Sequence, residues 1–444
     1  MTTTVPLGTA VPDRPVFVRD RLTGMAYGGL ALYAFLLYAL GPLLPLLRDD
    51  LRLSYTVMSL HSTAFAAGAV LTNLVFERAR RRFGYRTLFW AAAVGLVLGG
   101  LLLATGRSVA MTLTAAAVSG IGGALLQTTA LAVLAEHHGP LRDRALVEAN
   151  AGASATALAA PLVIGALQTA GAAWNWTLLV PPVAAAVLYA VFRHDRLRPR
   201  SDVSAHAGAP PGRGGAANDG GSVDGGGPAD ECGPVDDGGR LPAAFWLLAA
   251  LCGVAVGAEF CLVFYGSPQL TGVVGLTAGS AATAMSLFYA GALLGRLAGS
   301  RLTASRRLAE LIFAALGVSV AGFLTLWATG SAWVALTGLF LSGFGMANLF
   351  PLALSLAVSA APGSTGRATA YVQLLVGTAI MLAPLLLGGL SDRLGVRTAF
   401  GLAGLLLPLA ALLLLLGRRA AAATPPVPAP TSTPAAATAS QGVS

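Results

Sequence analysis

The chain has 444 residues, of which 55% are hydrophobic and only 11% are charged, whereas about 25% of the residues of an ordinary soluble domain are charged. This composition excludes a typical soluble protein and indicates one that is embedded in a lipid bilayer. The formal net charge is +9, but the basic residues form no stripe with interleaved aromatic side chains, so we expect no nucleic-acid partner.

Twelve stretches of the chain are apolar enough to cross a membrane, and each approaches the length of about 20 residues that a spanning helix needs. In chain order they lie near residues 23–47, 55–77, 86–105, 109–135, 144–168, 173–193, 242–266, 277–299, 307–329, 332–359, 366–390 and 396–417. The predicted fold class is therefore an all-α membrane protein with twelve transmembrane helices.

The first six stretches and the last six repeat each other at a constant offset. Ala160-Pro161 recurs as Ala383-Pro384, and Arg144 recurs as Arg367, in both cases 223 residues later. Six crossings return a chain to its starting side, so we predict two parallel, pseudo-symmetric six-helix halves, 22–195 and 241–418. Repeated membrane units are the usual construction of secondary transporters.

The segments outside the two halves are residues 1–21, 196–240 and 419–444. The linker and the C-terminal segment are rich in Gly, Pro, Ala or Thr, so we predict that both are disordered. All basic residues are arginine, and few of them fall on the side away from these segments: Arg48, Arg52, Arg107, Arg393 and Arg397. The bias predicts that both termini and the linker are cytoplasmic. Arginine without lysine is typical of GC-rich bacterial genomes, so we expect the bacterial cytoplasmic membrane.

Two parallel six-helix halves joined by a long cytoplasmic loop resemble the major facilitator superfamily, over roughly residues 22–418. The family's signature after helix 2 reads roughly Gly-x-Leu-Ala-Asp-Arg. The second-half copy keeps Gly295 and Arg301 but has Gly299 where the acid belongs, and the first-half copy has Glu77-Arg78. The resemblance implies that Arg78 and Arg301 belong to a cytoplasmic gate.

A second resemblance concerns the Pro-Gly patch of helix 5, which in this family is linked with exporters. The chain has Ala160-Pro161 followed by Gly165, and Ala383-Pro384 followed by Gly388-Gly389. The alternative is that each proline is simply a kink that a membrane helix tolerates.

Glu259 is the most unusual residue of the apolar stretches, because it lies well inside the seventh one. A charged side chain at the centre of a membrane helix costs about 2.5–3.5 kcal/mol, and burial favours the neutral form of a carboxyl group. We therefore predict that Glu259 binds the coupling proton or a cationic substrate. The alternative is a structural carboxyl group that hydrogen-bonds within the bundle.

Other polar side chains are candidates for substrate binding, because the resemblance implies that helices 1, 4, 7 and 10 line the cavity. Asn150 and Gln373 match at the offset of the repeat, and Tyr33 offers an aromatic ring. The predicted substrate-binding residues are Gln127, Asn150, Asn348, Gln373 and Tyr33. Each of the amides has an alternative role in hydrogen bonding between helices.

A second group of charges lies at the cytoplasmic starts of helices 5 and 11. Arg144 and Glu148 are four residues apart, a spacing that allows an ion pair on a helix, and Arg367 repeats Arg144. We predict that these three residues belong to the cytoplasmic gate. A simple contribution to the positive-inside bias is the alternative.

We predict a secondary active transporter that moves a small organic solute by alternating access. Because the cavity-lining helices carry few polar groups, proton-coupled export of a hydrophobic metabolite or drug by antiport is the first expectation. The alternatives are a proton-coupled uptake permease and a transport-inactive, transporter-like sensor or scaffold. Since no nucleophile–base pair or metal-ligand cluster is present, we expect no enzyme, metal or cofactor. The expected partners are a small-molecule substrate, the proton and the lipid bilayer, with the protein as a monomer.

Overall fold

The computed structural model describes residues 17–195, 240–302, 307–362 and 364–423. Within these ranges the first half contains α1 (Arg21–Leu51), α2 (Tyr55–Thr105), α3 (Val109–His138), η1 (Gly139–Leu141), α4 (Arg142–Thr169), η2 (Trp174–Leu179) and α5 (Val180–Phe192). The second half contains α7 (Ala243–Gly272), α8 (Ala278–Leu302), α9 (Leu308–Ala328), α10 (Ala332–Met346), α11 (Leu349–Ser359), α12 (Thr365–Leu394), α13 (Val396–Ala403) and α14 (Leu406–Ala423).

The linker and tails predicted from the sequence lie almost entirely outside the described residues. The exceptions are residues 17–21, which lead into α1, Arg240, and residues 419–423, which form the last turn of α14.

Eleven segments of the described chain are long and apolar enough to cross a membrane. The longest, α2, counts once among them but consists of two helices that meet at Gly84, where φ is 71° and ψ is 163°. Gly84 lies between the predicted spans 55–77 and 86–105, so the described part of the chain has the twelve crossings that the sequence predicts. Two of the other crossings each consist of two consecutive α-helices, α10 with α11 and α13 with α14. Two more include a short 3-10 helix, η1 after α3 and η2 before α5.

The backbone conformation at position 84 requires glycine, because only glycine adopts such a positive φ without strain. We expect Gly84→Ala to destabilise the protein by about 1–3 kcal/mol, the usual cost of a residue forced into a sparsely populated backbone region. Thermal unfolding in detergent checks this value. Gly100→Ala is the matched control, since Gly100 is helical with no neighbouring atom within 4 Å of an added Cβ, and it is expected to stabilise α2 slightly. Equal unfolding temperatures for the two variants would contradict the prediction.

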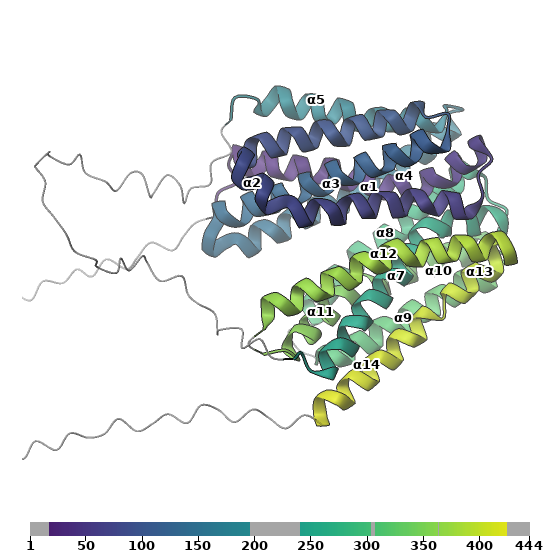
Figure 1. The fold of residues 1–444 in the computed structure, drawn as a ribbon. Coiled ribbons are helices and arrows are strands. Elements are labelled where there is room, and N and C mark those ends of the chain that lie inside the picture. Colours follow the sequence, from purple (N-terminus) through teal and green to yellow (C-terminus); the bar gives the residue numbers. More distant parts are fainter. Residues whose placement is uncertain (1–16, 196–239, 303–306, 363, 424–444) are drawn as a thin grey trace, which may run out of the picture.

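The helices form two groups, α1–α5 and α7–α14, with α1 beginning and α14 ending at the same end of the bundle (Figure 1). We call this end the terminal side and the opposite end, where Leu51 and Leu394 lie, the far side. Figure 1 shows the two groups inclined to each other, closest at the far side and spread apart toward the terminal side.

α1 and α7 lie at the centre of the molecule, between the two halves. Of the most apolar window of each helix, 72% of α7 and 67% of α1 is buried, compared with 17% of the crossing that contains α5. The two helices contact each other, and α1 also contacts α8. Side chains near the middle of α1 and α7 are therefore placed to contact the opposite half or a substrate bound at the boundary.

Close packing on the far side joins the halves through two glycines that the repeat makes equivalent. A Cβ at Gly165 on α4 would overlap Thr283 of α8, and one at Gly388 on α12 would lie 2.6 Å from Ser59 Oγ of α2. The glycines of the predicted Pro-Gly patches thus allow α4 to approach α8 and α12 to approach α2. Both contacts cross from one half to the other.

Candidate functional site

Glu259 lies near the middle of α7, roughly 20 Å along the helix from either end at 1.5 Å per residue. Its side chain is half-buried, while most of the residues around it on α7 are fully buried. No described side chain donates a hydrogen bond to its carboxylate. The carboxyl group of Glu259 therefore lies near the middle of the membrane and near the boundary between the two halves. A proton-coupling site is expected at such a position.

Arg296 on α8 is the cation that interacts electrostatically with Glu259, and it is not among the site residues predicted from the sequence. Side chains on a helix lean toward its N-terminus, which for α8 is the far side, so Arg296 extends from the terminal third of the helix toward the membrane centre. Its Nη1 donates to Ser154 Oγ of α4 at 2.9 Å, and it interacts electrostatically with Glu259. A signal was present in the sequence, because Arg296 falls inside the predicted span 277–299.

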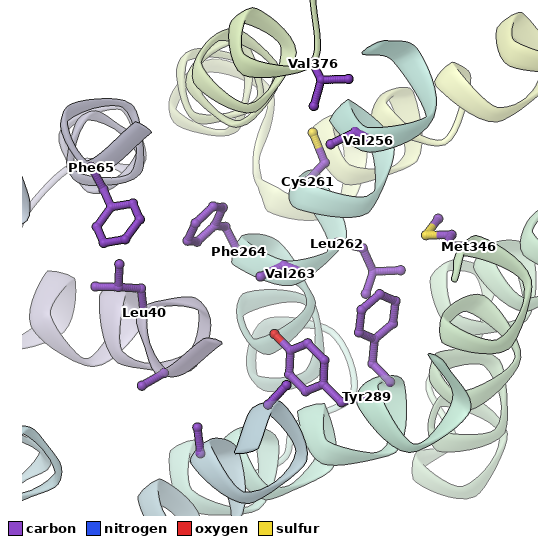
Figure 2. Packing of buried hydrophobic residues seen from close by; sticks show 14 of the residues in the cluster. Leu40, Phe65, Val256, Cys261, Leu262, Val263, Phe264, Tyr289, Met346 and Val376 are labelled. Carbon is purple, nitrogen blue, oxygen red and sulfur yellow. The ribbon is translucent and has the colours of Figure 1, made fainter. Parts of the chain in front are cut away.

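Two tyrosines complete this arrangement. Tyr38 of α1 and Tyr289 of α8 meet edge to face with ring centroids 5.0 Å apart. Tyr38 interacts electrostatically with Arg296 and Glu259, and Tyr289 with Tyr38 and Glu259. The Tyr289 side chain is only 5% exposed, and its hydroxyl has no hydrogen-bond partner among the described residues. Figure 2 shows its ring reaching from α8, with the oxygen beside α7 on the side toward α1.

We call Glu259, Arg296, Tyr38, Tyr289 and Ser154 the central cluster. Tyr38 and Ser154 come from the first half, and the other three come from the second. The surroundings are apolar: Leu40, Phe65, Val263 and Phe264 are among the buried side chains that pack between the halves (Figure 2). In so apolar a setting, the positions of one carboxyl and one guanidinium group control what the site can bind.

Three of the predicted substrate-binding residues lie within a single half. Tyr33 packs against Gly123 of α3, and Gln127 is a half-buried residue of the same α3. Asn348 occupies the break between α10 and α11, donates to the backbone oxygen of Gly295 at 2.5 Å and lines a small apolar pocket of the second half. Asn348 therefore makes the hydrogen bond between helices that was the alternative reading of this amide.

Asn150 and Gln373 lie on faces that meet the opposite half. Asn150 is one turn from Ser154 on α4, and its Nδ2 donates to Leu146 O at 2.8 Å. Gln373 is one turn from Gly377 on α12, which faces Val70 of α2. Both amides are exposed, because the seams α4–α8 and α2–α12 separate toward the terminal side. They occupy equivalent places on different seams rather than one shared site.

The predicted gate residues lie on the terminal side, but they do not form one network. Glu148 accepts from Arg144 at 3.3 Å and from Arg19, which precedes α1, at 2.8 and 2.9 Å. Arg367 donates to Ser364 Oγ at 3.4 Å within its own half. Arg78 and Arg301 are exposed. Glu148 thus ties the segment before α1 to α4, a contact within the first half.

A second functional feature, on the far side, was missed in the sequence. Asp392 near the end of α12 accepts hydrogen bonds from Tyr55 N at 2.7 Å, Thr56 N at 2.9 Å and Thr56 Oγ1 at 2.6 Å. These two amides are the first of α2, so a carboxylate of one half caps a helix of the other. Backbone N–H groups at a helix start have no partner within the helix and carry partial positive charge.

Two further hydrogen bonds join the halves near Asp392. The hydroxyl groups of Ser59 and Tyr265 lie 2.5 Å apart, and Thr63 donates to Met381 O at 2.9 Å. We call Asp392 and these two contacts the far-side latch. It closes the halves at this end, whereas Arg296, Asn150 and Gln373 are exposed on the terminal side of the same boundary.

Among the described residues, no group of three or more His, Cys, Asp or Glu side chains is arranged to hold a metal ion. Cys252 and Cys261 are buried, unpaired thiols.

Comparison with known proteins identifies the fold. The family model described as Major Facilitator Superfamily matches residues 26–362 and 247–441. No curated protein sequence matches the chain. A bacterial homologue of the human lysosomal transporter Spinster, in an inward-facing and occupied conformation, is similar with a TM-score of 0.67 and 15% identity, covering 90% of this chain and 96% of that one.

Two other solved structures have the same fold. The peptide transporter POT is similar with a TM-score of 0.67 at 15% identity, covering 93% of this chain and 97% of that one. The nucleoside transporter NupG has a TM-score of 0.64 at 9% identity, covering 90% and 98%. At such identities these likenesses show the fold alone, and the family model covers most of the chain. The chain belongs to the major facilitator superfamily and is a multi-pass membrane transport protein, not an enzyme.

Proposed function

We propose that this chain couples the movement of a proton to the transport of a small, largely apolar organic solute, with Glu259 as the proton-binding group. The observation that carries this proposal is a carboxyl group in the middle of the most buried helix, near the boundary of the halves, with no hydrogen-bond donor among the described side chains. Such a group is costly to keep charged, so it binds and releases a proton as the water access of the site alternates.

The proposed cycle starts from the arrangement described above. The far-side latch joins the halves at one end, and the exposed polar side chains of the boundary lie toward the other. With the termini in the cytoplasm, as the arginine distribution predicts, this is an inward-facing state of a monomer in the bacterial cytoplasmic membrane. Opening the latch and closing the terminal side presents Glu259 to the outside.

Two directions of transport have support from different observations. Export of a hydrophobic metabolite or drug in exchange for protons is supported by the apolar side chains around the central cluster. Uptake together with a proton is supported by Arg296, since a fixed cation next to a protonated Glu259 attracts an anion.

The proposed function is tested in a bacterial host stripped of its own exporters and grown on a panel of toxic compounds. Export is expected to give resistance, and uptake is expected to give selective hypersensitivity. A compound with an effect is then followed in proteoliposomes under an imposed pH gradient. Transport that persists unchanged when a protonophore collapses the gradient would contradict proton coupling.

A further inference from the structure

We propose that the solute carries a compact anionic group, such as a carboxylate, and that Arg296 binds it. This inference deepens the proposed function, since it rests on Glu259 as the proton-binding group and names the class of substrate. It also selects uptake with a proton over export by exchange.

Arg296 carries a positive charge inside a membrane-spanning helix. A guanidinium group has five N–H donors, and Ser154 Oγ is a neutral acceptor for one of them. Elsewhere in the chain, Arg19, Arg21 and Arg80 each form an ion pair with a carboxylate. No carboxylate among the described residues forms one with Arg296, although it lies inside a membrane-spanning helix. Arginines at such positions normally pair and normally mark substrate paths.

The net charge of the central cluster depends on whether Glu259 is protonated. Glu259 interacts with Arg296 electrostatically, and among the described residues the two form no salt bridge. An ionised Glu259 cancels the charge of Arg296 and repels an anion, whereas a protonated Glu259 leaves one positive charge uncompensated. Binding of the anion and binding of the proton therefore favour each other, and thermodynamic linkage makes the effect reciprocal. The two ligands cross the membrane together.

Among the described residues, Arg296 is the one charged group that acts on Glu259. The titratable groups that face Glu259 from the helices packed on α7 are Arg296 and Tyr289 of α8 and Tyr38 of α1. In α10 and α11 there are no charged or titratable residues, and those of α12, α13 and α14 lie toward the helix ends or the far side: Arg367, Tyr371, Asp392, Arg393, Arg397, Arg418 and Arg419.

The groups around Arg296 suit a carboxylate that is attached to a hydrocarbon. The planar fork of a guanidinium group matches a carboxylate with two parallel hydrogen bonds. The hydroxyl of Tyr289, buried without a hydrogen-bond partner among the described residues, supplies a further donor that interacts with Glu259. Apolar side chains such as Leu40 and Val263 surround these polar groups, so the rest of the substrate is hydrocarbon. The structure thus assigns the site to an amphipathic organic acid.

The test measures binding by calorimetry to the full chain in lipid nanodiscs. The probes are straight-chain carboxylates from acetate to decanoate, each with its amide and its primary amine. We expect at least one carboxylate to bind about tenfold or more tightly than its amide and amine. Arg296→Gln is expected to abolish this preference, and Arg107→Gln, which alters an exposed arginine of a far-side loop, is expected to keep it. Failure of every carboxylate to bind, or preferred binding of an amine, would overturn the proposal.

The link to the proton is tested separately with hexanesulfonate and decanesulfonate, which stay ionised at all working pH values. Their affinity is expected to fall by up to about tenfold per pH unit as Glu259 loses its proton, the limit for one linked proton. In Glu259→Gln, which mimics the protonated acid, affinity is expected to be high and independent of pH. Carboxylate binding through Arg296 without this pH dependence would refute the proposed proton site alone. Proton-coupled transport lost in Glu259→Gln, but unchanged in Arg296→Gln, would refute the anion site alone.

Discussion

Glu259→Gln is expected to abolish accumulation of substrate against its gradient while leaving the protein folded and inserted. Glutamine has nearly the same shape as a protonated glutamic acid but cannot release a proton. The proton gradient can therefore no longer drive the movement of the solute. The substitution also removes the group whose charged form is costly at this depth. The unfolding temperature is therefore expected to be unchanged or higher.

The measurement compares two assays in the same proteoliposomes. Accumulation driven by a pH gradient is expected to disappear in Glu259→Gln, whereas exchange of labelled for unlabelled substrate, which needs no net proton movement, is expected to persist. Glu310→Gln is the matched control, because Glu310 is an exposed acid in the first turn of α9. Gradient-driven accumulation by Glu259→Gln with the pH profile of the natural chain would refute the assignment.

Asp392→Asn is expected to open the far side of the molecule. A hydrogen bond to a charged group contributes about 1.5–3 kcal/mol, and the carboxylate of Asp392 accepts three of them from the start of α2. Asparagine keeps one carbonyl oxygen and brings an NH₂ group that faces amide donors. Loss of even one charged hydrogen bond shifts the equilibrium between far-side-closed and far-side-open states by about 10- to 150-fold.

Spin labels at the exposed far-side positions Arg107 and Arg397 report this shift as a distribution of distances between the halves. Asp392→Asn is expected to add or enlarge a longer-distance population. Asp49→Asn is the control, since Asp49 is a far-side acid that, among the described residues, pairs with its neighbour Arg48. The same distances in the natural chain and in Asp392→Asn would show that the latch contributes little.

The architecture was predictable because membrane crossings depend mainly on composition and length. The twelve spans, the parallel halves and the break near Gly84 all follow from apolar runs and the points that separate them. The conformational state was not predictable in the same way. It depends on which of two nearly equivalent sets of contacts is made, and a pseudo-symmetric sequence carries the residues for both.

The candidate site was predictable only in part, for a related reason. Glu259 stands out since its neighbours in the sequence are apolar. Arg296 is followed by Arg301 and lies near a helix end, so it resembles an ordinary charge of the membrane boundary until the lean of its side chain is known. Asp392, next to Arg393, likewise resembles a loop charge. Its role depends on the start of α2, more than 300 residues earlier in the chain.

Asp392 recognises main-chain amides for two of its three hydrogen bonds, and this has a consequence for how the protein varies. A contact with the backbone does not depend on which side chains stand at positions 55 and 56, so substitutions at Tyr55 and Thr56 leave the two main-chain hydrogen bonds of Asp392 intact. The acid has no such freedom. A mutational scan of this contact should therefore be asymmetric, tolerant at Tyr55 and Thr56 of α2 and intolerant at Asp392 of α12.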